Sequence, residues 1–187
     1  MTELLLVRHG RTEWNELGRL QGREDIPLDD VGTAQAVSAA RVLAQQRWDA
    51  VVSSPLGRAR GTAELIAAAC GLPAPSTEPD LVERHYGLAG GLFDHEVTAR
   101  WPDWVLPGSE SRLEVYDRVR PALDRLADAH PGGRVVVITH GGVIRSVVMG
   151  IEGWPEARRP GVDNLGATLL RTNEDGWKVA YYNRLLA

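Results

Sequence analysis

Short apolar runs alternate along the chain with longer segments in which apolar positions recur at helical spacing. Residues 4–7 form an apolar run that ends in a polar, glycine-containing loop, which predicts a buried strand of a parallel sheet. Residues 134–139, with the sequence RVVVIT, give the clearest strand prediction, and residues 48–53 give another. The segment 76–92 has no regular period and is predicted to be irregular.

Helices are predicted between these strands. The alanine-rich segment 30–46 has the apolar spacing of a helix. Ser54 is followed by a proline, which predicts a helix N-cap, and that helix is expected to end at Gly71. Residues 111–130 carry an apolar stripe at helical spacing. Pro121 interrupts the stripe and is expected to kink the helix or split it in two.

The remaining segments complete an α/β pattern. Two strands are predicted over 167–172 and 177–183, separated by the turn-like sequence NEDG. Alternating strands and helices predict a layered α/β sandwich with a mainly parallel sheet, to which the last hairpin adds an antiparallel edge strand. Residues 93–112 mix aromatic, acidic and proline residues and are expected to form a surface excursion. The length of 187 residues suits one domain over 1–187.

Composition narrows the classes of function. The net charge is −4, from 21 basic and 25 acidic residues, so the basic surface expected of a nucleic-acid-binding protein is absent. No apolar run approaches the roughly 18–20 residues of a membrane span, and the N-terminal segment lacks the basic region of a signal peptide. Cys70 is the only cysteine, which excludes a disulfide within the chain and favours a cytoplasmic location.

Two histidines occupy equivalent places after predicted strands. The sequences LLLVRHG and VVVITHGG each run from a buried strand into a histidine and a glycine, at His9 and His140. The carboxyl ends of parallel strands meet at one edge of a sheet, where ligands bind in open α/β folds, so we expect these two side chains to lie together. The strand over 48–53 leads to the same edge and delivers the helix that carries Arg58.

These residue types suit chemistry on phosphate. Arg8 and Arg58 are permanent cations whose fork-shaped donors match phosphate oxygens. A neutral imidazole, here His9, is a competent nucleophile, and a protonated His140 would stabilise negative charge during transfer. Glu83 is a candidate acid for the leaving alcohol if its surroundings keep it protonated.

Each of these residues taken alone has a simpler interpretation as a structural hydrogen-bonding group, a solvated arginine or a surface ion pair. The combination of two matched strand ends favours the functional interpretation. A metal site is the main chemical alternative, but no two histidines have the helical spacing of a zinc motif, and one cysteine forms no thiolate cluster. No glycine-rich nucleotide-binding loop follows a strand. We therefore expect no metal and no cofactor.

The sequence resembles the histidine phosphatase superfamily, which includes the cofactor-dependent phosphoglycerate mutases. The likeness begins in LLLVRHGRTEWN (4–15) and spans about three quarters of the chain, continuing in the same order through RLQG (19–22), PLDDVGTAQA (27–36), SSPLGRARGTAELI (53–66), LVERHYG (81–87), PGSES (107–111) and VVVITHGGVIR (135–145). The resemblance implies a phosphoglycerate mutase-like, three-layer α/β/α sandwich.

The resemblance also implies individual roles. His9 matches the phosphorylated nucleophile, Glu83 matches the proton donor, and the other phosphate-pocket groups match Arg8, Arg58 and His140. Residues that match phosphate or substrate contacts are Asn15, Gln21, Gly22, Tyr86 and Gly141. Two positions depart from the family pattern. Arg11 either adds a cation at the pocket mouth or pairs with Glu13, and Gly61 stands where glutamine is usual.

The resemblance leaves three functions open. A mutase needs further cations for a carboxylate and a second phosphate, and the acidic segment 93–112 lacks the basic residues that mutases place there, although Arg84 and Arg112 are partial substitutes. The favoured function is hydrolysis of a small phosphorylated metabolite. Phosphoglycerate mutase is the alternative, and a non-catalytic phosphate-binding protein is the third. Trp14, Trp101 and Trp104 either border the pocket or anchor their segments, and a homodimer is compatible with the sequence.

Overall fold

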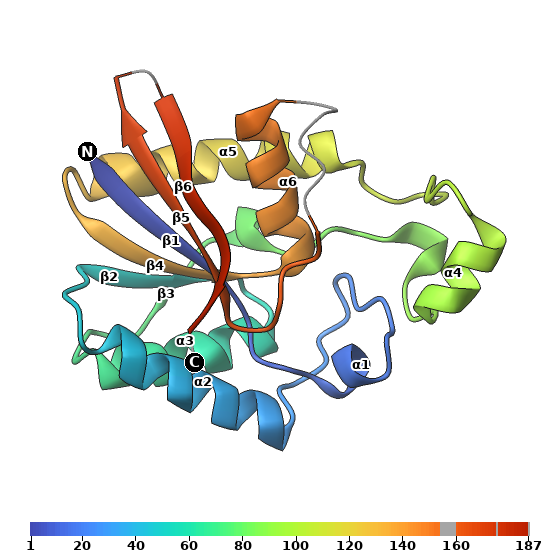
Figure 1. Ribbon diagram of the computed structural model, residues 1–187, viewed down its shortest axis with the longest axis horizontal. Helices are drawn as coiled ribbons and strands as arrows, with labels where there is room; N and C mark the ends of the chain where they lie inside the picture. Colours follow the sequence, from blue (N-terminus) through green and yellow to red (C-terminus); the bar gives the residue numbers. More distant parts are fainter. Residues whose placement is uncertain (154–159, 175, 187) are drawn as a thin grey trace.

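A six-stranded sheet with helices on both faces organises the chain in the computed structural model, which describes residues 1–153, 160–174 and 176–186 (Figure 1). The strand order is β3-β2-β4-β1-β5-β6. The strands are β1 (Thr2–Arg8), β2 (Ala50–Ser53), β3 (Ser76–Thr77), β4 (Arg134–Thr139), β5 (Gly166–Asn173) and β6 (Gly176–Leu185). The first four are parallel, whereas β5 and β6 are antiparallel to their neighbours. The mainly parallel sheet is confirmed, and the last hairpin adds the antiparallel edge strand that the sequence predicts.

The helices complete a three-layer sandwich. They are α1 (Glu13–Glu16), α2 (Asp30–Leu43), α3 (Gly57–Ala69), α4 (Asp94–Arg100), α5 (Arg112–Ala129) and α6 (Gly141–Glu152), with two 3₁₀ turns, η1 (Pro79–Leu81) and η2 (Gly87–Ala89). Helices α2 and α3 cover one face of the sheet, and α5 and α6 cover the other (Figure 1). None of the helices in the described ranges is long and apolar enough to cross a membrane.

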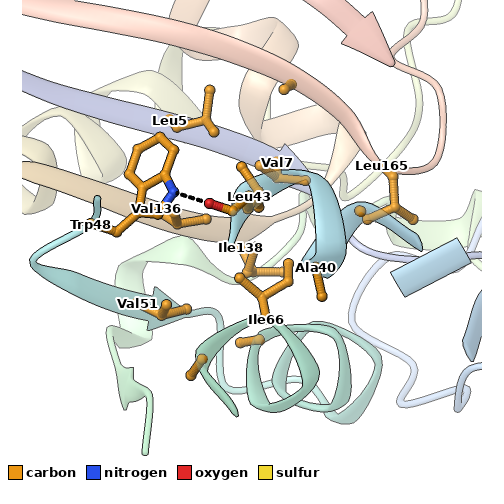
Figure 2. Packing of buried hydrophobic residues seen from close by; sticks show 14 of the residues in the cluster. Leu5, Val7, Ala40, Leu43, Trp48, Val51, Ile66, Val136, Ile138 and Leu165 are labelled. Atoms are coloured by element: carbon orange, nitrogen blue, oxygen red, sulfur yellow. Dashed lines mark hydrogen bonds between the residues drawn. The ribbon is translucent and has the colours of Figure 1, made fainter. Parts of the chain in front are cut away.

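The core forms because β1 and β4 bury both of their faces. Successive side chains of a strand point to opposite sides. Leu5 and Val7 therefore pack toward α2 and α3, while Leu4 and Leu6 pack toward α5 and α6. Figure 2 shows the cluster on the α2 and α3 side, where the indole of Trp48 donates to a backbone carbonyl at 3.0 Å. This two-sided packing makes the carboxyl end of the sheet a rigid base for the residues that follow it.

Two details of the sequence prediction are wrong, the start of α3 and the lack of regular structure in 76–92. Helix α3 begins at Gly57, with Leu56 rather than Ser54 at its N-cap, while the Ser54 hydroxyl accepts from the amide of Leu56 at 3.4 Å and lies 2.7 Å from Nε2 of His140. Of the two alternatives at Pro121, a split is excluded, since α5 runs through the proline as one element. The segment predicted to be irregular, 76–92, contains β3 and both 3₁₀ turns. A proline inside a helix removes one N–H donor, but the packed apolar face of α5 holds the helix together.

The segment 93–112 lies to one side of the sheet (Figure 1). It contains α4, and its residues Val97, Leu106 and Trp101 pack in a small apolar cluster with Ala89 and Leu20 from outside the segment. Trp101 therefore anchors the segment. The cavity of the candidate site is lined both by this segment and by residues at the carboxyl end of the sheet.

Candidate active site

His9 and His140 lie side by side at the carboxyl ends of adjacent strands. Their strands β1 and β4 pair in parallel, with Arg8 opposite Thr139, so each histidine directly follows a paired position. The ring centroids are 5.2 Å apart in an edge-on arrangement, and both side chains are almost fully buried. The structure thus brings the two histidines together as the strand pattern predicted.

Hydrogen bonds define the tautomer of His9. Its Nδ1 lies 2.7 Å from the carbonyl oxygen of Gly10, which can only accept, so Nδ1 carries the proton. Its Nε2 accepts from Nε of Arg58 at 3.2 Å and therefore carries the lone pair. Burial, followed by the charges of Arg58 and Arg8, holds the pKa of His9 well below its usual value. The ring is consequently neutral, with an unprotonated Nε2.

Arg58 connects His9 to the loop over 19–24. Its guanidinium is buried and donates to the carbonyl oxygens of Gly22 at 2.8 Å and Glu24 at 2.6 Å. One turn further along α3, Thr62 donates to the backbone of Arg58 and accepts from the amide of Gly10. The start of α3, the His9 loop and the 19–24 loop therefore form one fixed unit.

His140 differs from His9 in its partners. Its Nε2 lies 2.7 Å from the hydroxyl of Ser54, and its Nδ1 is buried without a hydrogen-bond partner among the described residues. Burial, followed by the charges of Arg58 and Arg8, holds the pKa of His140 well below its usual value. The surrounding side chains thus favour a neutral ring. Protonation requires a bound anion to offset those positive charges.

Arg8 and the start of α6 form another wall of the site. One Arg8 nitrogen donates to the carbonyl oxygen of Val162 at 2.5 Å, while its Nε is buried without a partner in the described part of the chain. Its side chain lies against Gly141, the first residue of α6. The amide of Asn164 donates to the carbonyl of His9 and to Asn15, which places Asn15 beside the His9 loop.

Glu83 is buried against the same helix start. Its two carboxylate oxygens accept from the backbone amides of Arg84 at 2.7 Å and Gly142 at 3.1 Å. A Cβ at Gly142 would lie 2.5 Å from a Glu83 oxygen and 3.2 Å from the Tyr86 hydroxyl, so any larger residue there would have to displace the Glu83 carboxyl group. Burial raises the pKa of Tyr86, which keeps its phenol protonated.

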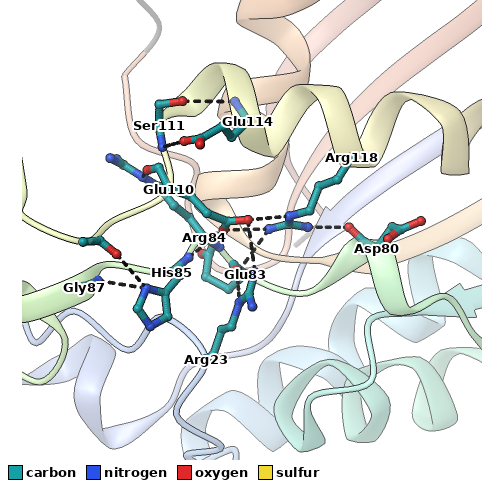
Figure 3. Close-up of polar contacts among 11 residues, drawn as sticks. Arg23, Asp80, Glu83, Arg84, His85, Gly87, Glu110, Ser111, Glu114 and Arg118 are labelled. Carbon is teal, nitrogen blue, oxygen red and sulfur yellow. Dashed lines mark hydrogen bonds and ion pairs between the residues drawn. The ribbon is translucent and has the colours of Figure 1, made fainter.

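A network of ion pairs and hydrogen bonds holds the backbone of Glu83 in place (Figure 3). Arg118 donates to Glu110 at 2.9 Å and to the Glu83 carbonyl at 3.3 Å, and Arg23 makes the corresponding contacts at 3.0 and 3.4 Å. Burial alone would raise the pKa of Glu110, but hydrogen bonds from Arg118 and the His85 amide lower it. Glu110 therefore stays ionised and ties two arginines to the backbone of Glu83.

These elements enclose a cavity of about 390 Å³. It is lined by most of the residues that the sequence singled out, namely Arg8, His9, Asn15, Gln21, Gly22, Arg58, Glu83, Tyr86 and Gly141. His140 lies behind His9 and contacts its ring. Two of the tryptophans, Trp14 and Trp104, also line the cavity.

Comparison with known proteins identifies the family. The sequence matches the histidine phosphatase superfamily (branch 1) over residues 4–185. The chain belongs to the histidine phosphatase superfamily. It is 36% identical over 184 residues to the uncharacterized phosphatase PhoE of Bacillus subtilis, covering 98% of this chain and 95% of PhoE.

Two further relatives are phosphatases with named substrates. A metal-independent phosphoserine phosphatase of Arabidopsis thaliana is 42% identical over 164 residues, which is 81% of this chain and 69% of that protein. The structure of a mycobacterial glucosyl-3-phosphoglycerate phosphatase complexed with VO₃ superimposes with a TM-score of 0.88 at 31% identity, covering 97% and 98% of the two chains. This histidine phosphatase is therefore a phosphoric monoester hydrolase with the phosphoglycerate mutase-like fold.

Several cavity residues of this histidine phosphatase were missed or misplaced by the sequence prediction. Arg19 and Arg145 line the cavity, although neither was singled out. Arg145 follows Gly141 by four residues, and helical spacing after the His-Gly-Gly motif was the available signal. Arg11 takes neither predicted position, because it pairs with Glu16 and Asp29 away from the cavity.

Arg112 and Arg84 lie in different places relative to the cavity. Arg112, named from the sequence as a partial substitute for missing cations, lines the cavity. Arg84 instead donates to the Glu110 carbonyl at 2.6 Å and approaches the Ser109 hydroxyl at 3.4 Å, outside the histidine cavity. No group of three histidine, cysteine or acidic side chains within residues 1–153, 160–174 and 176–186 has the arrangement of a metal site.

Proposed function

We propose that this enzyme hydrolyses a small phosphorylated metabolite through a phosphohistidine formed on Nε2 of His9. The observation that carries this proposal is the tautomer of His9. Its Nδ1–H is held by the Gly10 carbonyl, so the only lone pair of the neutral ring is on Nε2, beside Arg58. A neutral imidazole nitrogen and a fixed guanidinium beside it together supply the nucleophile and the anion-binding group that phosphoryl transfer needs.

In the first step, the phosphate group binds between Arg8 and Arg58, and Nε2 of His9 attacks phosphorus. The bond between phosphorus and the ester oxygen breaks as the phosphorus–nitrogen bond forms. Glu83, protonated in this step, gives its proton to the leaving oxygen, which departs as an alcohol. The two arginines and His140, protonated once the anion is bound, stabilise the charge on the transferring group.

In the second step, water attacks the phosphohistidine. Glu83, now a carboxylate, accepts a proton from this water, the phosphorus–nitrogen bond breaks, and its electron pair returns to Nε2. Inorganic phosphate then leaves, and His9 and Glu83 regain their starting protonation states. No metal enters these steps.

The cavity and the relatives support a small substrate. A volume of about 390 Å³ is near the lower end of small-molecule sites. The segment 93–112 contributes Asp94, Trp104 and Arg112 to the lining, so we propose that it sets specificity. Two similar phosphatases are named for phosphoserine and glucosyl-3-phosphoglycerate. The sequence argued against phosphoglycerate mutase activity because further cations were missing. Arg112 and Arg145 line the cavity and supply such cations, so this argument no longer holds.

The test is release of inorganic phosphate from p-nitrophenyl phosphate and a panel of phosphorylated metabolites. We expect hydrolysis by the wild type, none by His9→Ala, and unchanged hydrolysis by the control His130→Ala at the end of α5. Transfer of phosphate between the 2 and 3 positions of glycerate with little free phosphate would select the mutase. Binding of phosphate esters without turnover would select a binding protein, and full activity in His9→Ala would overturn the proposed nucleophile.

A further inference from the structure

The cavity contains a second pair of cations beyond those proposed to hold the transferring phosphate. Arg112 is the first residue of α5, and Arg145 lies in the first half of α6. Both guanidinium groups line the same cavity as His9. Burial and the charge of Arg145 lower the pKa of Arg112 to about 10, which indicates that the two like charges are close.

Neither member of this pair has a partner in the described part of the chain. Among the described residues, Nη1 of Arg112 and Nε of Arg145 are buried without a hydrogen bond, and neither side chain takes part in an ion pair. Nearby Arg118 is different, because it donates to Glu110 and to two backbone carbonyls. Two half-buried, unpaired like charges are unfavourable unless an anion binds between them.

Arg112 and Arg145 lie apart from the groups that we propose to bind the reacting phosphate. Arg112, Arg145 and Trp104 line both the histidine cavity and an adjoining outer cavity, which lies against Leu106 and Ser109. Arg8, His9 and Arg58 line only the inner one. A ligand whose phosphate lies at His9 would therefore present its other end to Arg112 and Arg145.

We propose that Arg112 and Arg145 form a second anion subsite, and that the preferred substrates are small phosphate monoesters with a second anionic group. This inference rests on the proposed function, which places the reacting phosphate at His9. The fork-shaped donors of arginine match the two oxygens of a carboxylate as well as those of a second phosphate. Both kinds of ligand carry a second negative charge, which a molecule bound in the cavity of about 390 Å³ would place at Arg112 and Arg145.

Matched substrate pairs test this subsite. Phosphoserine and phosphoethanolamine differ by one carboxylate, as do 3-phosphoglycerate and glycerol 3-phosphate, whereas fructose 1,6-bisphosphate and fructose 6-phosphate differ by one phosphate. The kcat/KM ratio within each pair is measured for the wild type, Arg112→Gln and Arg145→Gln. Arg120→Gln is the control, since that arginine pairs with Asp124 on α5 and lines neither cavity.

We expect the wild type to prefer the more anionic member. Each glutamine variant should lose about 10- to 100-fold in kcat/KM toward that member, the effect of losing a charged hydrogen bond, while activity toward the less charged member changes little. Retained activity toward the less charged member also shows that the variant is folded. The carboxylate and bisphosphate pairs show which anion the subsite takes. Arg145→Lys and Arg112→Lys should restore part of the preference, because they keep the charge and lose the fork.

The same within-pair ratio in the wild type and both glutamine variants would overturn the subsite while leaving the histidine mechanism intact. Activity that persists in His9→Ala would instead overturn the proposed function. If neither member of any pair is hydrolysed, the ratio is obtained from dissociation constants measured by calorimetry. Equal ratios there overturn the subsite, and a loss of discrimination in the variants supports it.

Discussion

Arg58 donates a hydrogen bond to the only lone pair of His9, with 3.2 Å between Arg58 Nε and His9 Nε2. The group that we propose to bind phosphate therefore occupies the atom that we propose to attack it. Phosphate oxygens compete for the same donor, so binding of the substrate frees Nε2 and positions phosphorus near it. On the proposed mechanism, Nε2 of His9 therefore becomes available for attack only when an anion enters the cavity.

Arg58→Lys tests this relationship. Lysine keeps the charge but cannot contact His9, Gly22 and Glu24 together, so we expect kcat/KM to fall by about 100- to 1,000-fold. Steady-state kinetics with p-nitrophenyl phosphate measure the effect. Arg60→Lys, an exposed substitution two residues further along α3, is the control and should retain activity. Equal activity of the two variants would contradict the role of the fork.

The protonation state of His9 is a second prediction. Burial and the charges of Arg58 and Arg8 hold its pKa well below 6.5, so the folded protein should keep a neutral His9 ring at pH 6.5, where an unperturbed histidine is half protonated. Ring ¹⁵N chemical shifts measured between pH 5 and 8 should show a protonated Nδ1 and an unprotonated Nε2. Titration of His9 with a midpoint at or above 6.5 would show that this electrostatic description is wrong.

Two helical glycines should respond in opposite ways to alanine. A Cβ at Gly142 meets a Glu83 oxygen at 2.5 Å, so Gly142→Ala should displace Glu83 and reduce kcat by more than tenfold. At Gly61, the Cβ finds only Leu28 at an ordinary 3.5 Å, so Gly61→Ala should stabilise the fold by about 0.5–1 kcal/mol. Thermal unfolding and kinetics on both variants check this. Loss of stability in Gly61→Ala would show that the added methyl group does not fit.

The proton-donor role that we propose for Glu83 predicts a dependence on the leaving group. Glu83→Gln should slow hydrolysis of alkyl phosphates far more than that of p-nitrophenyl phosphate, whose leaving group needs little protonation. Glu110→Gln should show the same pattern more weakly, because Glu110 positions Glu83 through Arg23 and Arg118. Rates for a series of leaving groups measure both effects. A uniform loss across the series would argue that neither residue affects proton donation.

The strand-end geometry was predictable from the sequence because it depends on local pattern. Parallel strands end at the same edge of a sheet, and because β1 and β4 are also neighbours, His9 and His140 meet there. The end of α3 near Gly71 followed equally from a local signal, since this glycine has a φ of 66° directly after the helix.

The arrangements that were not predictable depend on contacts distant in sequence. Ser54 has the local features of an N-cap, but β4 places His140 2.7 Å from its hydroxyl. Arg11 pairs with Asp29 because the start of α2 packs against the His9 loop. Arg145 faces the cavity only because α6 packs with that side toward the end of the sheet. Each outcome was decided by tertiary packing rather than by propensity.

The covalent intermediate is the most direct test of the account. A rapidly quenched reaction, analysed by mass spectrometry and ³¹P nuclear magnetic resonance, locates the phosphoryl group. We predict a phosphoramidate on Nε2 of His9 that is lost in acid, persists in base and is absent from His9→Ala. An acid-stable phosphoryl group, or one on any residue other than His9, would contradict the central claim.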